Sequence, residues 1–299
     1  AEEIVWLYNE CGLFCLVQGR LDSAAGLFAI ALRAAKEIEG GDRHSALWCR
    51  IHLNLAVADI ERGRIREARK NLNAIVAIED ENPILRLLVR GYLALVDHYS
   101  GNADAAERVF VEVIEDLDKY GQSRSVAIFS RHLAELYRIK GPEAGPKALA
   151  SVDRSIAAAT KGGHEDVRQM ARLSRVRLAI DRLLPEEADY IPRRLDEIEK
   201  YGIDMGMPRL VADTAYARAS HLLRLGETRH ATQLACQCIG VATANQLRLR
   251  QMTAMALLGR ICERRGLVHA ARQLLARAFE LAENCDYSNV RASVRRHHA

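Results

Sequence analysis

The chain repeats a short pattern about every 41 residues. A glycine is followed five residues later by an alanine, and a small residue stands seven positions before the glycine. The five regular glycines are Gly19, Gly63, Gly101, Gly226 and Gly266, preceded by Gly12, Ala56, Ala94, Ala219 and Gly259. Gly141, with Ala134 seven positions before it, continues the series. A period of this length is typical of proteins built from stacked copies of one structural unit.

Each copy has the pattern of a helical hairpin. Apolar residues recur at three- and four-residue spacing, as in Leu53, Val57 and Ile60, which gives a helix one buried face. The glycine ends the first helix because it adopts a backbone conformation that other residues resist. The small residue and the alanine allow the two helices to pack closely. No alternation typical of strands interrupts the pattern, so we predict an all-α protein.

The hairpins are expected to stack on one another, because a single hairpin cannot bury the apolar faces of both of its helices. We therefore predict a single elongated solenoid over residues 1–299, with about seven antiparallel helix pairs. A helix at 287–298 is expected to cap the stack or to begin another, truncated repeat. The fifth repeat, which Pro185 and Pro192 interrupt, is expected to be irregular. The predicted repeats span roughly 3–39, 44–79, 83–120, 123–161, 164–201, 207–243 and 245–284.

Composition and charge exclude several classes of protein. The formal net charge is only +4, from 43 basic and 39 acidic residues, which makes nucleic acid an unlikely partner. No apolar run approaches the roughly 20 residues that a membrane span requires. The seven cysteines are odd in number and lack framework spacing, as expected of reduced thiols in a cytoplasmic protein. The chain starts with Ala1, which suggests that it was cut from a longer protein.

No motif in the sequence predicts catalysis, a metal or a cofactor. Cys11 and Cys15 lie one helical turn apart, but a zinc site needs two further ligands and none stands nearby. There is no His-Glu-x-x-His helix and no glycine-rich phosphate loop. The acidic clusters, such as Glu115 and Asp116, are typical of solvated helix faces. We therefore expect a protein that is not an enzyme and that holds neither metal nor cofactor.

The repeated residues resemble those of the tetratricopeptide repeat. The small residue, the glycine seven later and the alanine five beyond it match that family over nearly the whole chain. The usual period of this family is 34 residues, so longer helices are expected here. Such helices occur in the variants found in kinesin light chains and in the sensor domains of maltose-regulator-like signalling ATPases. The resemblance implies a right-handed superhelical solenoid whose first helices line a concave groove.

This geometry implies which side chains face the groove. The candidates are mostly apolar towards the N-terminus and charged towards the middle, which suits an extended peptide or a partner helix. Each of them has the alternative of simply packing between repeats. Taken from the register of the small residue, the candidates are Trp6, Asn9, Leu13, Arg50, Leu53, Val57, Leu95, His98, Arg131, Glu135, Arg138 and Tyr216, with Ile128, Asp213 and Ser220 in the same register.

The leading hypothesis is a module for protein–protein interaction, which binds a peptide or a segment of a partner protein in the groove. The alternative is a sensor or regulatory domain of a larger signalling ATPase or transcription regulator. In that role it would bind a small molecule or a neighbouring domain of the full-length protein. A third hypothesis, binding of RNA by the repeats, is disfavoured by the near-neutral charge and by the lack of interleaved aromatic residues.

Overall fold

The computed structural model describes residues 2–38, 46–78, 82–181 and 189–288, and this part is almost entirely helical. It contains no strand. The helices are α1 (Glu2–Val17), α2 (Leu21–Ile38), α3 (Ala46–Glu61), α4 (Ile65–Val76), α5 (Pro83–Tyr99), α6 (Ala103–Lys119), α7 (Ser123–Lys140), the 3₁₀ turn η1 (Pro142–Ala144), α8 (Gly145–Lys161), α9 (Glu165–Ile180), α10 (Ile191–Asp204), α11 (Pro208–Arg224), α12 (Thr228–Ala244), α13 (Arg248–Arg264) and α14 (Val268–Asn284).

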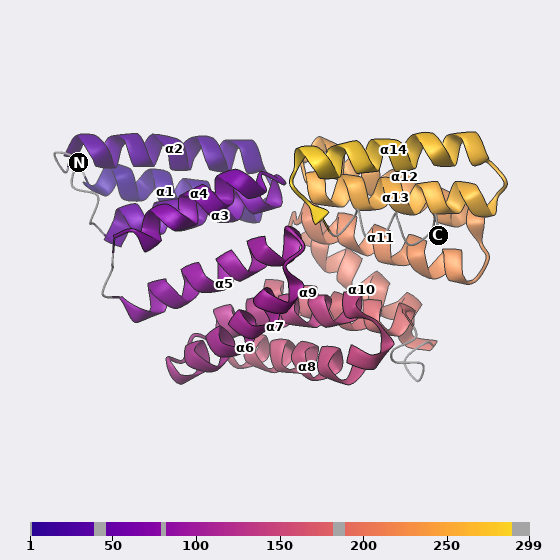
Figure 1. Cartoon of the computed structure of the whole chain (residues 1–299), viewed down its shortest axis with the longest axis horizontal. Helices are drawn as coiled ribbons and strands as arrows, with labels where there is room; N and C mark the ends of the chain where they lie inside the picture. Colours follow the sequence, from indigo (N-terminus) through magenta and orange to yellow (C-terminus); the bar gives the residue numbers. More distant parts are fainter. Residues whose placement is uncertain (1, 39–45, 79–81, 182–188, 289–299) are drawn as a thin grey trace.

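Consecutive helices pack as antiparallel pairs, α1 with α2 through to α13 with α14, and each pair stacks on the next. Figure 1 shows the pairs following one another along the chain. The prediction of an all-helical solenoid of helix pairs is confirmed for the described ranges. Of the predicted terminal helix at 287–298, all but the first two residues lie outside those ranges, as does Pro185.

The repeated sequence positions meet in space. A Cβ atom added to Gly12 in α1 would lie 2.5 Å from the ring of Phe28 in α2, and one added to Gly259 in α13 would lie 2.8 Å from Leu275 in α14. The small residue of the first helix therefore leaves room for the bulky apolar residue of the second. The glycine between them, Gly63 in the second repeat, ends α3 in the left-handed region at φ +73°.

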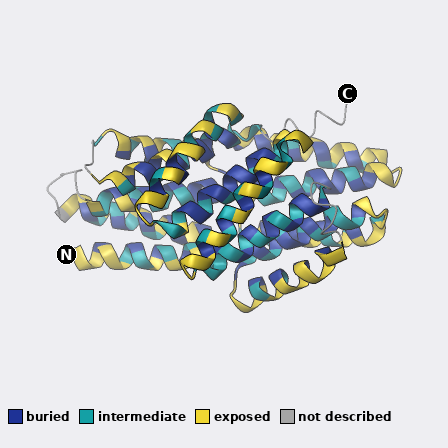
Figure 2. Cartoon of the chain, turned by 90° about the horizontal axis from the view of Figure 1, so that it is seen from below, coloured by how far each residue is buried: buried dark blue, intermediate teal, exposed yellow. Residues whose placement is uncertain are grey.

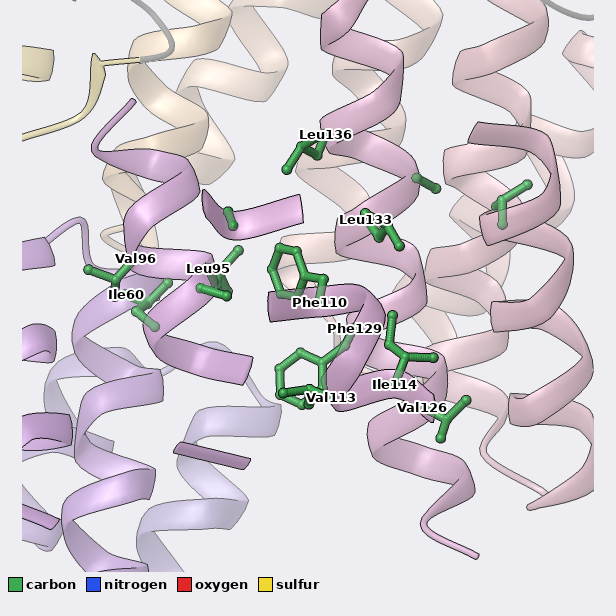
Figure 3. Packing of buried hydrophobic residues seen from close by; sticks show 14 of the residues in the cluster. Ile60, Leu95, Val96, Phe110, Val113, Ile114, Val126, Phe129, Leu133 and Leu136 are labelled. Carbon is green, nitrogen blue, oxygen red and sulfur yellow. The ribbon is translucent and has the colours of Figure 1, made fainter. Parts of the chain in front are cut away.

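The core is a continuous layer between the paired helices. Figure 2 shows buried residues on the inward faces of the helices and exposed residues on the outward faces. Around α5, α6 and α7 the layer is filled by large side chains, among them Phe110, Ile114 and Phe129, none more than 2% exposed (Figure 3). The rings of Phe110 and Phe129 lie 6.1 Å apart. Burial of this apolar surface is the main favourable contribution to folding.

The repeat pattern predicts an open, elongated array, and this prediction is wrong. The last repeats of the solenoid return to contact its first ones. Figure 1 shows α13 and α14 beside the ends of α2, α3 and α5. The Ser288 hydroxyl donates to the Ser100 carbonyl at 2.8 Å, and the rings of Tyr99 and Tyr287 lie 5.2 Å apart. Pro208 contacts Gly19. The small rotation of each pair against its neighbour adds up to a turn that brings both ends together.

None of the described helices is long and apolar enough to cross a membrane.

Candidate functional site

The interior of the turn is lined mainly by the odd-numbered helices and contains three cavities. The N-terminal cavity, of about 400 Å³, is bounded chiefly by apolar side chains, including Leu13, Leu53, Val57, Leu95, Ile128 and Met170. The central cavity, of about 90 Å³, lies among His98, Arg131, Glu135, Arg209, Asp213 and Arg250. The C-terminal cavity, of about 610 Å³, is bounded by residues that include Arg138, Arg177, Asp181, Tyr216, Leu257 and Arg260.

The three cavities adjoin one another in series, because neighbouring cavities share lining residues. Arg131, His132 and Arg209 line both the N-terminal and the central cavity. Arg177 and Tyr216 line both the central and the C-terminal cavity. The interior therefore changes from apolar to strongly charged along one path.

Most of the groove residues that the sequence predicts line these cavities. Leu13, Leu53, Val57 and Leu95 line the N-terminal cavity, together with Arg131. His98, Glu135 and Tyr216 line the central cavity, and Arg138 lines the C-terminal one. Ile128, Asp213 and Ser220, in the same register, also line cavities.

Trp6, Asn9 and Arg50 do not line any of the three cavities. Trp6 and Arg50 are exposed, whereas Asn9 is buried and accepts a hydrogen bond from Asn54 Nδ2 at 2.8 Å. These three residues stand in the first two repeats and on the N-terminal side of the small residue. Leu13 and Val57, nearer the C-terminal ends of α1 and α3, do line the N-terminal cavity.

Part of the charged wall was not predicted from the sequence. The groove candidates did not include Glu61, Arg177, Arg209 or Arg250, although all four line the interior. For the last repeat a signal existed. Counted from Gly259, the same register indicates Thr253, Ala256 and Arg260, all of which line the C-terminal cavity. Glu61 and Arg250 meet only because the solenoid closes, which no local pattern encodes.

Glu61 is the focus of the first charged cluster. Its carboxylate accepts from Arg209 Nη1 at 2.7 Å and from Arg250 Nη1 at 2.6 Å, and Arg250 also reaches Asp213 at 3.3 Å. Burial alone would raise the pKa of Glu61, but Arg209 and Arg250 hold it below its ordinary value. The carboxylate is therefore ionised at neutral pH. It lines the N-terminal cavity beside Arg209, which also lines the central one.

Glu135 organises the second charged cluster. Arg138 donates to both of its carboxylate oxygens, at 2.7 and 2.9 Å, and Arg177 lies 3.3 Å away. Arg138 also pairs with Asp181, which accepts from Arg224 at 3.0 Å. Burial opposes the charge of Glu135, yet the two neighbouring arginines keep its pKa well below the ordinary value. This cluster separates the central cavity from the C-terminal one.

The histidines of the wall are neutral at pH 7. Burial lowers the pKa of His98 to about 4, and burial together with Arg131 lowers that of His132 well below its ordinary value. Within the described ranges, no three His, Cys, Asp or Glu side chains are placed to hold a metal ion. Cys11 is exposed on α1 and Cys15 is buried. The chemistry that this interior offers is hydrogen bonding, ion pairing and apolar contact.

Two solved structures share this architecture. A Rap protein complexed with competence and sporulation factor superposes with a TM-score of 0.70, covering 99% of this chain and 81% of its own, at 14% sequence identity. NprR in complex with its cognate peptide NprX gives a TM-score of 0.62 over 93% and 81% of the two chains, also at 14% identity. The chain has the tetratricopeptide type of fold. At this identity the similarity establishes the fold alone. No protein-family model matches the sequence, and no curated protein matches it either.

Proposed function

We propose that this chain is a non-enzymatic module that binds a peptide, or an extended segment of a protein partner, inside the turn of its solenoid. The observation that carries the proposal is the series of three adjoining cavities, to which all seven odd-numbered helices contribute side chains. A path of this kind suits an extended ligand, which can place successive side chains in successive cavities. NprR was determined in complex with its cognate peptide NprX, and the Rap protein in complex with competence and sporulation factor, which supports the same role.

The apolar and the charged parts of the lining would make different contacts with the ligand. The N-terminal cavity offers Leu13, Leu95 and Ile128, against which an apolar anchor of the ligand would be desolvated. The guanidinium groups at the centre would orient the polar atoms of the ligand backbone through charge-assisted hydrogen bonds. Affinity would then come mainly from the apolar end, and direction along the path from the charged centre.

The experiment is a selection of linear dodecapeptides from a random phage-displayed library on the immobilised chain, followed by calorimetry of the enriched peptides. Two variants obstruct the path: Ile128→Asp in the N-terminal cavity and Ser220→Trp in the C-terminal one. Two matched controls, Val76→Asp on α4 and Ala276→Trp on α14, place the same side chains at exposed positions on even-numbered helices.

We expect at least a tenfold loss of affinity in one or both cavity variants and less than a twofold change in the controls. Circular dichroism of all four variants verifies that they are folded. The proposal fails if the selection enriches no sequence over the blank surface, or if folded cavity variants bind as tightly as the controls.

A further inference from the structure

Arg131 stands in the wall shared by the N-terminal and central cavities, and no carboxylate in the described part of the chain lies within ion-pair distance of it. Its Nη2 donates to His132 Nε2 at 2.8 Å, while its Nε, although buried, has no acceptor. His132 is neutral at pH 7, so this hydrogen bond leaves the charge of the guanidinium uncompensated.

The carboxylates around Arg131 are already engaged. Glu61 is shared by Arg209 and Arg250, and Asp213 pairs with Arg250. Glu135, one turn further along α7, is bound by Arg138. The Nε of Arg209 is also buried without an acceptor, since its nearest carboxylate oxygen, on Asp213, is 4.0 Å away. Arg131, Arg209 and Arg250 thus face two carboxylates, Glu61 and Asp213, and this cluster has one positive charge in excess.

This excess has an electrostatic cost. Burial and the neighbouring Arg209 lower the pKa of Arg131 to about 10, which means that the surroundings disfavour its charged form. A partly buried guanidinium is stabilised when an anion completes its hydrogen bonds. One singly charged anion would balance the cluster.

The surroundings of Arg131 also indicate what such an anion is attached to. On the side of the N-terminal cavity the adjacent lining is apolar, with Leu53, Leu95 and Ile128. On the other side the central cavity, at about 90 Å³, has room for little more than a small polar group. An anion bound here would sit at the narrow, charged end of an apolar space.

We propose that Arg131 anchors a carboxylate of the peptide ligand, with a neighbouring apolar side chain of that ligand seated in the N-terminal cavity. This inference rests on the proposed function and names the chemical class that the site selects. The carboxylate has two sources in a peptide, the C-terminus and the side chains of Asp and Glu, and both have the same chemistry.

The test uses N-acetylated hexapeptide libraries as probes, with affinity selection on the full chain and detection by mass spectrometry. The first pool has a free C-terminus and no Asp or Glu, the second is amidated with Asp and Glu, and the third is amidated without them. We expect binders from the first pool, the second, or both, and none of comparable affinity from the third. The pool that binds identifies the source of the carboxylate.

The variant Arg131→Met tests the anchor itself, with Arg90→Met on the exposed surface of α5 as the matched control. A hydrogen-bonded charge pair contributes enough that its loss should weaken carboxylate-bearing binders about 10- to 100-fold. The control should leave their affinity unchanged. Because Arg131→Met removes an uncompensated charge, it should be at least as resistant to urea as the natural chain.

The role of Arg131 as an anchor is overturned if peptides of the third pool bind as tightly as the others. It is also overturned if Arg131→Met leaves the affinity of the carboxylate-bearing binders unchanged. In both cases the peptide-binding function still stands. If no pool binds at all, the proposed function fails and this inference fails with it.

Discussion

Arg250 Nη1 donates to Glu61 Oε2 at 2.6 Å, although the two residues lie 189 positions apart in the chain. The contact joins the end of α3 in the second repeat to the beginning of α13 in the last. Arg209 at the start of α11 binds the other oxygen of the same carboxylate, at 2.7 Å. One buried side chain of the second repeat therefore holds two helices of the C-terminal repeats against it.

Replacing Glu61 by alanine should destabilise the protein strongly. The substitution leaves Arg209 and Arg250 buried with less compensation, and removal of one partner from a buried pair costs about 3–5 kcal/mol. Urea unfolding measures the loss. Small-angle scattering should also show a larger radius of gyration, because the contact between the two ends is weakened.

An exposed ion pair supplies the control for this substitution. Glu112 pairs with Arg90 at 2.6 Å, but their side chains are 60% and 46% exposed. Glu112→Ala should therefore cost at most about 1 kcal/mol and leave the scattering profile unchanged. Equal losses in the two variants would show that the Glu61 contact does not hold the ends together.

Gly63→Ala should weaken the same closure by steric means. A Cβ atom at this position would lie 3.0 Å from Cys285 Sγ and 3.3 Å from Arg248 Cβ, and the backbone is left-handed at φ +73°. Gly226, at φ +85°, has no atom within 4 Å of the same added carbon. Both substitutions should destabilise the protein by about 1 kcal/mol through backbone strain. Gly63→Ala should destabilise it further, because the added carbon is also crowded. Thermal unfolding of the two variants, compared side by side, measures the difference.

The contribution of His98 to the stability of the protein should fall as the pH is lowered from 6.5 to 4. Burial lowers the pKa of His98 to about 4, against an ordinary value of about 6.5, so the unfolded chain takes up this proton first. His98 alone should account for about 2 kcal/mol between pH 7 and pH 5. Glu135, which faces it, stays ionised, and His132 contributes in the same direction. Urea unfolding of His98→Asn should show a smaller pH dependence than the natural chain, and identical slopes would contradict the prediction.

Two apolar residues of α1 should tolerate substitution, whereas the residues at the same positions of the repeat in α3 should not. Leu7 and Phe14 stand five before and two after the small residue and are 55% and 60% exposed. In α3 the same positions are Ile51 and Ala58, both fully buried, because α2 covers that side of the helix. Ile51→Ala should cost about 2–5 kcal/mol, and Leu7→Ala less than about 0.5 kcal/mol. Similar losses would mean that this face of α1 is covered in solution.

The repeat made the local structure predictable. The small residue, the glycine and the bulky apolar residue act within one hairpin, as the contact of Gly12 with Phe28 shows, so a single sequence reveals them. The same register also places Leu13, Leu95 and Glu135 in the walls of the interior. In each case the determining neighbours are close in sequence or belong to an adjacent copy of the pattern.

The closure of the solenoid was not predictable in this way. It depends on small rotations between successive pairs, and a sequence pattern does not report angles of that size. The pairing of Glu61 with Arg250 follows from it. The uncompensated charge of Arg131 also emerges only when the helices of distant repeats are assembled around it.

Contacts between the first three and the last two repeats change how such a protein should melt. In an open array each unit depends only on its neighbours, so the ends fray first and unfolding spreads inwards. Here the C-terminal repeats are held by partners in the first three repeats, such as Ser100 for Ser288 and Glu61 for Arg250. The array should therefore lose its structure in one cooperative transition, and a ligand that bridges the interior would raise the temperature of that transition for every repeat at once.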